Sequence, residues 1–247
     1  MSQKILMGIY KDFKNAKVVF AGQTNVGKSS LVYNFDQDGA ILGHSPENLF
    51  LGTESQKRVN NAQFDPIPTI GAAFVRKRII RNDELITLDI WDTAGQERFH
   101  SISRLYFRNT QYCILVFDVT DANTFNDLNI WKRLCDNAES NIIDTVRGVL
   151  RESIKNSNIL NGNVTYFLVG NKIDKGPRAV PEEDIRDFCQ RNNITSYIET
   201  SAITGDGVAT LYEEIVNHIY TNGTAATCVI TSVIDQRIPA SNSYCSC

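Results

Sequence analysis

The sequence predicts an α/β fold with a mostly parallel central sheet, one antiparallel edge strand and helices on both faces of the sheet. Short apolar runs alternate with segments of helical periodicity along the chain, which is typical of βαβ units. Two of these runs are separated only by the residues from Arg81 to Glu84, and this short connection predicts a hairpin at the edge of the sheet. The chain has 247 residues, enough for one enlarged domain or two small ones.

Six strands are expected, each from a short apolar run. They span Lys17–Ala21, Phe74–Ile80, Leu85–Trp91, Tyr112–Val119, Val164–Val169 and Ser196–Glu199. Helices are expected after Lys28, Thr124, Pro181 and Gly207. The last helix is the clearest, because the apolar residues between Val208 and Ile219 repeat at helical spacing and form one stripe.

The chain is expected to divide into an extension, one domain and a tail. Residues 1–14 precede a domain over residues 15–220, and residues 221–247 form a flexible tail that is rich in Ser, Thr and Ala. Two polar stretches, near residues 36–66 and 136–163, exceed the usual length of a strand-to-helix connection and are interpreted as surface insertions. The second contains one possible helix, around Ile142 to Ile154.

The charge and hydropathy of the chain exclude several classes of function. Its 25 basic and 28 acidic side chains give a formal net charge of -3, which lacks the basic surplus of a nucleic-acid-binding protein. The longest strongly apolar run, Tyr112 to Phe117, is far shorter than the roughly 20 residues that cross a bilayer. The amino-terminal residues show no continuous apolar stretch of a secretion signal. We therefore expect a cytosolic protein that binds no nucleic acid.

A glycine-rich loop follows the first expected strand and precedes a helix. Residues 22–29 match the pattern G-x-x-x-x-G-K-[ST] of a phosphate-binding P-loop, in which backbone N–H groups and the helix N-terminus face phosphate oxygens. Lys28 is expected to reach the β and γ phosphates, and the Ser29 hydroxyl to bind Mg²⁺. The nucleotide-binding residues predicted here are Gly22, Gln23, Thr24, Asn25, Val26, Gly27, Lys28, Ser29 and Ser30.

A second motif lies at the carboxyl end of the third strand, which opens on the same crevice as the P-loop. Residues 92–96 read Asp-Thr-Ala-Gly-Gln. Asp92 is predicted to hold Mg²⁺ through water, and the backbone N–H of Gly95 to contact the γ phosphate. Gln96 is placed to orient the attacking water, a catalytic role that needs no strong base. Together with Lys28, these residues predict hydrolysis of a nucleoside triphosphate.

Two further loops predict the base. In Asn-Lys-Ile-Asp, residues 171–174, the carboxylate of Asp174 can accept hydrogen bonds from N1–H and the amino group of guanine, which adenine does not offer. In Glu-Thr-Ser-Ala, residues 199–202, the Ala202 N–H could approach guanine O6. The predicted ligands are therefore GTP and GDP, and an ATPase is disfavoured. The base site is completed by Asn171, Lys172, Asp174, Ser201 and Ala202.

These motifs resemble those of the Ras superfamily of small GTPases, which are P-loop NTPases with a small G-domain, and within it the Rab family. The resemblance covers roughly residues 15–220 and includes Pro-Thr-Ile-Gly-Ala-Ala-Phe at residues 68–74 and IWDTAGQERF at residues 90–99. It implies that Thr69 is the switch I threonine, which acts in catalysis by closing onto Mg²⁺ and the γ phosphate. The sequence of residues 70–74 is most similar to that of the endocytic, early-endosome Rabs.

The resemblance also implies a membrane switch that is controlled by other proteins. Such a protein acts as a monomer with an exchange factor, a GTPase-activating protein (GAP), a GDP-dissociation inhibitor and effectors in vesicle-mediated transport. The chain ends in Cys245-Ser246-Cys247, which resembles the ending on which Rabs receive two geranylgeranyl groups. Two lipid chains are what stable anchoring requires. The expected location is the cytoplasmic face of endosomal membranes, with cycling through the cytosol.

Three departures from the family pattern concern the base and the partners. The gap from Ser29 to Thr69 is long, which leaves Phe64 as the nearest candidate for packing on the guanine. Ile203 stands where a lysine commonly follows Ser-Ala, which removes one possible contact near the base. Residues 107–110 differ from the sequence that usually follows switch II in this family, which bears on the choice of effector.

A fourth departure concerns the rate of hydrolysis. Thr24 stands where many relatives have Gly or Ser, and its β-branched side chain would crowd Gln96 near the γ phosphate. Slow intrinsic hydrolysis is therefore expected. An alternative of a different class stays open: a scaffold of the same fold that holds GTP and hardly turns it over.

Overall fold

The computed structural model describes residues 13–37, 69, 71–81, 84–95, 105–149 and 164–222. Within these ranges the strands form one sheet in the order β2-β3-β1-β4-β5-β6. Neighbouring strands are parallel except for β2, which is antiparallel to β3. The predicted α/β class is therefore confirmed. The strands are β1 Phe13–Ala21, β2 Ala72–Arg81, β3 Glu84–Thr93, β4 Tyr112–Asp118, β5 Thr165–Asn171 and β6 Ile194–Thr200.

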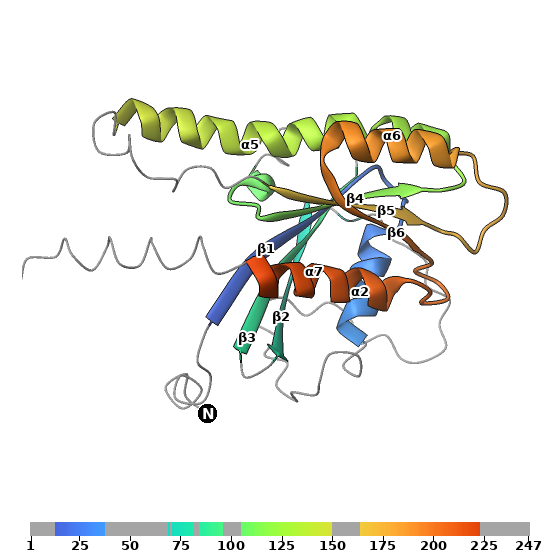
Figure 1. Ribbon diagram of the computed structural model, residues 1–247, viewed down its shortest axis with the longest axis horizontal. Helices are drawn as coiled ribbons and strands as arrows, with labels where there is room; N and C mark the ends of the chain where they lie inside the picture. The colour runs from blue at the N-terminus through green and yellow to red at the C-terminus, as the bar shows by residue number, and fades with distance from the viewer. Residues whose placement is uncertain are drawn as a thin grey trace, which may run out of the picture.

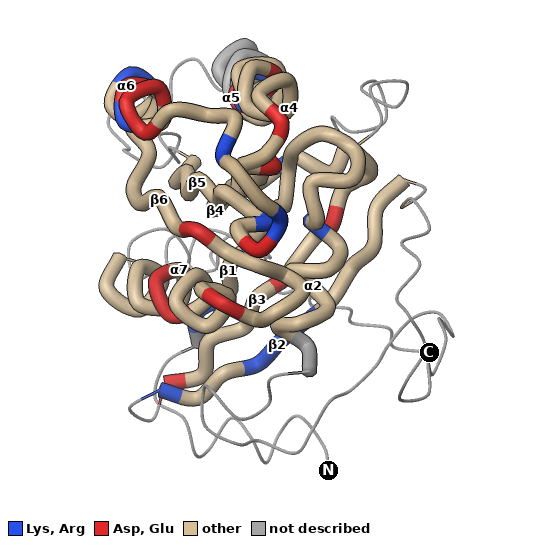
Figure 2. Tube along the Cα trace, turned by 90° about the vertical axis from the view of Figure 1, so that its right-hand side faces the viewer, with Lys and Arg blue, Asp and Glu red and all other residues tan. Residues whose placement is uncertain are grey.

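Helices cover both faces of this sheet, as Figures 1 and 2 show: α5 and α6 lie on one face, and α2 and α7 on the other. The helices are α2 Lys28–Gln37, α4 Ala122–Asn126, α5 Leu128–Val149, α6 Glu182–Asn192 and α7 Val208–Asn222. None of the helices in the described ranges is long and apolar enough to cross a membrane.

Helices bury both faces of the sheet, and each strand supplies side chains to both cores because alternate residues of a strand point to opposite sides. In β1, Val18 and Phe20 join the core under α2 and α7, whereas Val19 and Ala21 join the core under α5 and α6. Each fully buried aliphatic or aromatic side chain contributes roughly 1.5–3 kcal/mol to folding. The two cores therefore hold rigid the carboxyl end of the sheet, where the predicted motifs lie.

The observed strands coincide with the predicted ones except at their ends. The largest difference is in β1, which starts at Phe13 rather than Lys17 and so includes the last two residues assigned to the extension. The periodicity hides this start because Lys14 is buried although it is charged. The hairpin of β2 and β3 is antiparallel, as predicted, with Arg81 paired to Glu84.

The helical segment after β4 differs from the prediction. A short helix, α4, begins at Ala122, where the Asp121 carboxylate accepts a hydrogen bond from the N–H of Asn123. A longer helix, α5, follows and continues to Val149, so it takes in the first part of the stretch 136–163 and overlaps the helix expected around Ile142 to Ile154. The rest of that stretch, and residues 38–66 of the other predicted insertion, lie outside the described residues.

Candidate nucleotide site

The loop between β1 and α2 packs so closely against its neighbours that two of its positions have no room for a side chain. Gly27 has φ 100°, and a Cβ placed there would lie 2.1 Å from Nδ2 of Asn171. A Cβ on Gly22 would lie 2.2 Å from the carbonyl oxygen of Val116. Both glycines are therefore required by close packing. The loop leads directly into α2, whose first N–H groups have no partner within the helix and favour an anion.

Lys28 lies under this loop and is buried. Its ammonium donates hydrogen bonds to the carbonyl oxygens of Gly22, at 2.9 Å, and Gln23, at 2.8 Å. Burial lowers the pKa of Lys28 to about 8, against the opposing attraction of Asp92. The ammonium is thus held by weak acceptors beside the helix N-terminus, where phosphate oxygens would be stronger partners.

Ser29, Thr69 and Asp92 come together although they are far apart in sequence. The Ser29 hydroxyl donates to Oδ2 of Asp92 at 2.6 Å, and the Thr69 hydroxyl donates to the same oxygen at 3.2 Å. The two hydroxyl oxygens are 2.9 Å apart. These are three of the residues predicted to bind Mg²⁺ or the γ phosphate.

The surroundings of Asp92 fit a bound cation. Its other carboxylate oxygen, Oδ1, is buried and lacks a hydrogen-bond partner. Burial raises the pKa of Asp92, although the hydrogen bond from Ser29 and the charge of Lys28 oppose this shift. A hard cation such as Mg²⁺ takes oxygen ligands of this kind and, when bound, would neutralise charge on a phosphate. No cluster of three His, Cys, Asp or Glu that could hold a metal occurs in the described ranges. The hydroxyls of Ser29 and Thr69 would therefore serve as ligands beside Asp92.

Gly95 lies against the P-loop. A Cβ at this position would be 2.3 Å from the backbone nitrogen of Thr24, so only glycine allows the approach. The preceding residue, Ala94, donates its N–H to the carbonyl of Gly71 at 2.8 Å. The hydroxyl of Thr24 is buried without a hydrogen-bond partner. The segments predicted to sense the γ phosphate are therefore in contact with each other and with the loop.

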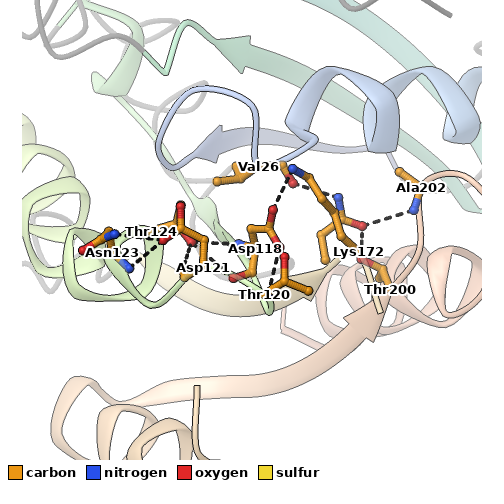
Figure 3. A network of polar contacts seen from close by, with 10 residues as sticks. Val26, Asp118, Thr120, Asp121, Asn123, Thr124, Lys172, Thr200 and Ala202 are labelled. Carbon is orange, nitrogen blue, oxygen red and sulfur yellow. Dashed lines mark hydrogen bonds and ion pairs between the residues drawn. The ribbon is translucent and has the colours of Figure 1, made fainter. Parts of the chain in front are cut away.

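Asn171 joins three loops, and its partners Val26, Thr200 and Ala202 are labelled in Figure 3. Its amide nitrogen donates to the carbonyl of Val26 in the P-loop at 2.8 Å. Its amide oxygen accepts from the Thr200 hydroxyl at 3.0 Å and from the N–H of Ala202 at 3.1 Å. The Ala202 N–H, which the sequence suggested for guanine O6, thus has a protein partner here. Sequence reasoning treated Asn171 only as a ligand, and its role as a link between loops was missed.

The two predicted base-reading loops also contact each other. The Ser201 hydroxyl donates to Oδ1 of Asp174 at 2.5 Å and accepts from the N–H of Thr204 at 3.1 Å. Asp174 itself is exposed, as a residue that meets a ligand should be. Ile203 is 78% exposed and makes no contribution to the core. The loops after β5 and β6 therefore form one unit with Asp174 at its surface.

An acidic residue that the motif search missed lies in the same region. The carboxylate of Asp118, at the end of β4, is 2.7 Å from the ammonium of Lys172. Asp118 was counted as part of an apolar strand, but its place at the carboxyl end of a central parallel strand was an available signal. Several predicted residues lie outside the described ranges, so their placement stays a prediction: Phe64, Gln96, Cys245 and Cys247.

Comparison with known proteins agrees with this geometry. The sequence profile of the Ras family matches residues 57–221. The chain is 34% identical to a probable Rab-related GTPase of Acanthamoeba polyphaga mimivirus, over 81% of this chain and 74% of that protein. It is 32% identical to the GTP-binding protein YPT53 of Saccharomyces cerevisiae, with the same shares covered. It is 31% identical to the Ras-related protein Rab5A of Oryza sativa, over 94% of this chain and 96% of that protein.

A six-stranded α/β domain of this topology, with a P-loop sequence between its first strand and a helix, is the architecture of a small G-domain. The chain belongs to the Ras family, and its relatives include Rab-related GTPases. Proteins of this family are generally GTP hydrolases that bind GTP and GDP with Mg²⁺. The profile match begins after the P-loop, at residue 57, so the P-loop geometry described above is independent support for membership.

Proposed function

We propose that this protein is a Rab-type switch that binds and hydrolyses GTP on the cytoplasmic face of membranes and regulates vesicle-mediated transport, in the endocytic branch. The observation that carries the proposal is the meeting of Ser29, Thr69 and Asp92 beside Lys28, with one buried oxygen of Asp92 left without a partner. The endocytic assignment is supported by the sequence of residues 70–74, which is similar to that of the endocytic Rabs.

In this proposal the described residues divide the work of binding. The P-loop N–H groups and Lys28 hold the phosphates, while Ser29, Thr69 and Asp92 hold Mg²⁺, which neutralises developing charge on the γ phosphate. Asp174 selects guanine, and Gln96 orients the attacking water. No arginine of the chain is assigned to the transition state, so a GAP is expected to supply one.

Switching would act through contacts that already join the two phosphate-sensing segments. Ala94 and Gly71 are hydrogen bonded, and a Cβ on Gly71 would lie 3.4 Å from the Tyr106 hydroxyl. The Tyr106 ring lies 5.7 Å from that of Trp91, which lies 5.0 Å from that of Phe74. Phe74 is 41% exposed, so this aromatic cluster offers effectors a surface that changes when the γ phosphate is lost.

Membrane attachment is proposed through geranylgeranyl groups on Cys245 and Cys247, with a GDP-dissociation inhibitor extracting the inactive form. Mass spectrometry of the protein from its native cells checks this point, since unmodified carboxyl-terminal cysteines would contradict it. An exchange factor would then reload the protein with GTP.

The central experiment is single-turnover hydrolysis of GTP by the purified protein with Mg²⁺, together with chromatography of the nucleotide that co-purifies. We expect bound guanine nucleotide and slow turnover that Gln96→Leu slows further and that Ser29→Asn abolishes by weakening Mg²⁺ binding. Turnover that is unchanged in Gln96→Leu would remove this residue from the mechanism. Retained ATP in place of guanine nucleotide would contradict the proposal as a whole.

The same assay separates the switch from a GTP-holding scaffold. The backbone of Thr24 lies against Gly95, and the Thr24 hydroxyl is buried without a hydrogen-bond partner. A branched side chain at this position of the P-loop supports steric interference at the γ phosphate. We expect Thr24→Gly to hydrolyse GTP several-fold faster than the natural protein, because it removes a branched side chain from the P-loop. GTP that stays intact in both proteins would favour the scaffold.

A further inference from the structure

Asp118 is held among polar groups at the carboxyl end of β4, between the P-loop side of the sheet and the loop after β5. Its oxygen Oδ2 is 2.7 Å from the Lys172 ammonium, and the two side chains are only 10% and 12% exposed. The other oxygen, Oδ1, accepts from the N–H of Thr120 at 2.9 Å and from its hydroxyl at 2.7 Å. Figure 3 shows these contacts side by side.

The carboxylate is charged in this setting. Burial opposes its ionisation, but the Lys172 ammonium and the two Thr120 donors outweigh burial and hold the pKa of Asp118 below its ordinary value. The ion pair is therefore intact at neutral pH. Removing one member of a partly buried pair leaves the other without compensation, which costs more than the loss of a surface pair.

Lys172 adopts a backbone conformation that needs support. Its φ is 70°, in the left-handed region where residues other than glycine are uncommon and cost roughly 1–3 kcal/mol. The turn lies between Asn171, which links the P-loop to Ala202, and Asp174, which contacts Ser201. A change in the Lys172 turn would thus move the loop that reads the base relative to the loop that holds the phosphates.

We propose that Asp118 is a positioning residue that sets how long guanine nucleotide stays bound, by clamping the side chain of Lys172 and so fixing the turn at residues 171–174. This inference rests on the proposed nucleotide site, to which it adds a residue that contacts no ligand itself. The clamp ties the base-reading loop to the central strand of the sheet. Its loss would lower the barrier to nucleotide release without altering the Ser29, Thr69 and Asp92 cluster.

The backbone of Asp118 is held independently of its carboxylate. Its N–H donates to the Thr124 hydroxyl at 3.0 Å, and its carbonyl accepts from the same hydroxyl at 3.3 Å. Asp118→Asn keeps the size of the side chain and these backbone contacts, and removes only the charge. The variant is therefore expected to fold, with a melting temperature lowered by the uncompensated charge of Lys172.

The test measures release of fluorescent mant-GDP from the full chain in Mg²⁺ buffer after excess GDP is added. We expect Asp118→Asn to release mant-GDP about ten-fold faster, a change typical of breaking a coupled polar contact. Asp118→Glu keeps the carboxylate, so its release rate should lie between the rates of the natural protein and of Asp118→Asn. Single-turnover hydrolysis of GTP that is already bound should be unchanged, which a general loss of structure would not allow.

Two further variants make the test specific. Asp136→Asn is the matched control, because Asp136 also holds a lysine ammonium, that of Lys132 at 2.8 Å, and accepts from the Tyr166 hydroxyl, but on α5. It should leave release unchanged. Lys172→Met should release nucleotide quickly, and adding Asp118→Asn to it should cause no more than a two-fold further change, since Asp118 acts through Lys172.

The outcomes separate this inference from the proposed function. A natural protein that fails to retain mant-GDP would contradict the proposed nucleotide site. A natural protein that retains it, with release from Asp118→Asn within two-fold of the natural rate, would overturn the inference alone. Effects of Asp118→Asn and Lys172→Met that multiply fully in the double variant would also overturn it, because they would show independent action.

Discussion

Two buried charges of opposite sign define the site at the scale of the residue. Burial works against both: it lowers the pKa of Lys28 and raises the pKa of Asp92. Each charge is only partly compensated in the free protein, Lys28 by carbonyl oxygens and Asp92 by hydroxyls. Phosphates and a divalent cation would compensate both charges, which is the physical reason that these residues favour a ligand.

The pKa of Lys28 predicts how binding depends on pH. In the proposed site Lys28 holds phosphate as an ammonium, and its pKa in the free protein is about 8, so binding above this pH would require uptake of a proton. We expect the association constant for GDP to fall toward ten-fold per pH unit above about pH 8. Calorimetric titrations from pH 7 to about 9 measure this, below the range in which guanine itself ionises.

Lys28→Arg is the control, because guanidinium stays charged throughout this range. Its affinity for GDP should be lower but nearly independent of pH, and a flat profile in the natural protein would contradict the prediction. The sign of the shift also bears on stability. The nucleotide-free protein should gain unfolding free energy as the pH rises from about 8 toward 10.5, since only the unfolded chain still binds the proton.

At the scale of the element, a buried lysine joins the end of α7 to two strands. The Lys14 ammonium, on β1, donates to the carbonyl of Tyr220 at 2.7 Å and lies 2.8 Å from the carboxylate of Glu84 on β3. It also lies 4.6 Å from the centre of the Tyr220 ring, which Arg81 of β2 approaches at 5.6 Å. These contacts of Lys14 explain why β1 begins earlier than the apolar pattern suggests.

Lys14→Met should destabilise the fold, because it leaves the Tyr220 carbonyl without its donor and the Glu84 carboxylate without its ion-pair partner. We expect a loss of about 2 kcal/mol in the free energy of unfolding, measured by chemical denaturation. The matched change at an exposed position, Lys175→Met, should alter this free energy by less than about 0.5 kcal/mol. Equal effects of the two changes would argue against a stabilising role for the Lys14 contacts.

At the scale of the whole molecule, the site gathers groups from the carboxyl ends of neighbouring strands. The P-loop follows β1, Asp92 is the last but one residue of β3, Asp118 ends β4, Asn171 ends β5 and Ala202 follows β6. No single element contains the site. A ligand that contacts several of these ends therefore holds the sheet together, and its binding energy adds to the stability of the fold.

Removal of ligand should therefore destabilise the protein measurably. GDP with Mg²⁺ at a hundred-fold excess over its dissociation constant should add about 2.7 kcal/mol to the free energy of unfolding, and chelation of Mg²⁺ with EDTA should remove part of this gain. Denaturation curves with and without GDP and EDTA measure both effects. ATP at the same concentration is the control, and equal stabilisation by ATP and GDP would contradict the guanine assignment.

The sequence by itself determined the sheet, its hairpin and the identity of the motifs. This was possible because apolar periodicity reports burial locally, and because the P-loop is defined by residues at fixed short spacing. The order of the loops along the chain also indicated that their ends would meet, since parallel strands present their carboxyl ends at one edge.

Only the tertiary structure decided which charged and polar side chains become each other's partners. In the sequence, Lys14 looks like an ordinary charged residue and Asp118 like part of an apolar strand. Their roles depend on Tyr220 and Lys172, respectively. No local pattern encodes such pairings, because a buried charge is stabilised by whatever folding brings beside it, often from the far end of the chain.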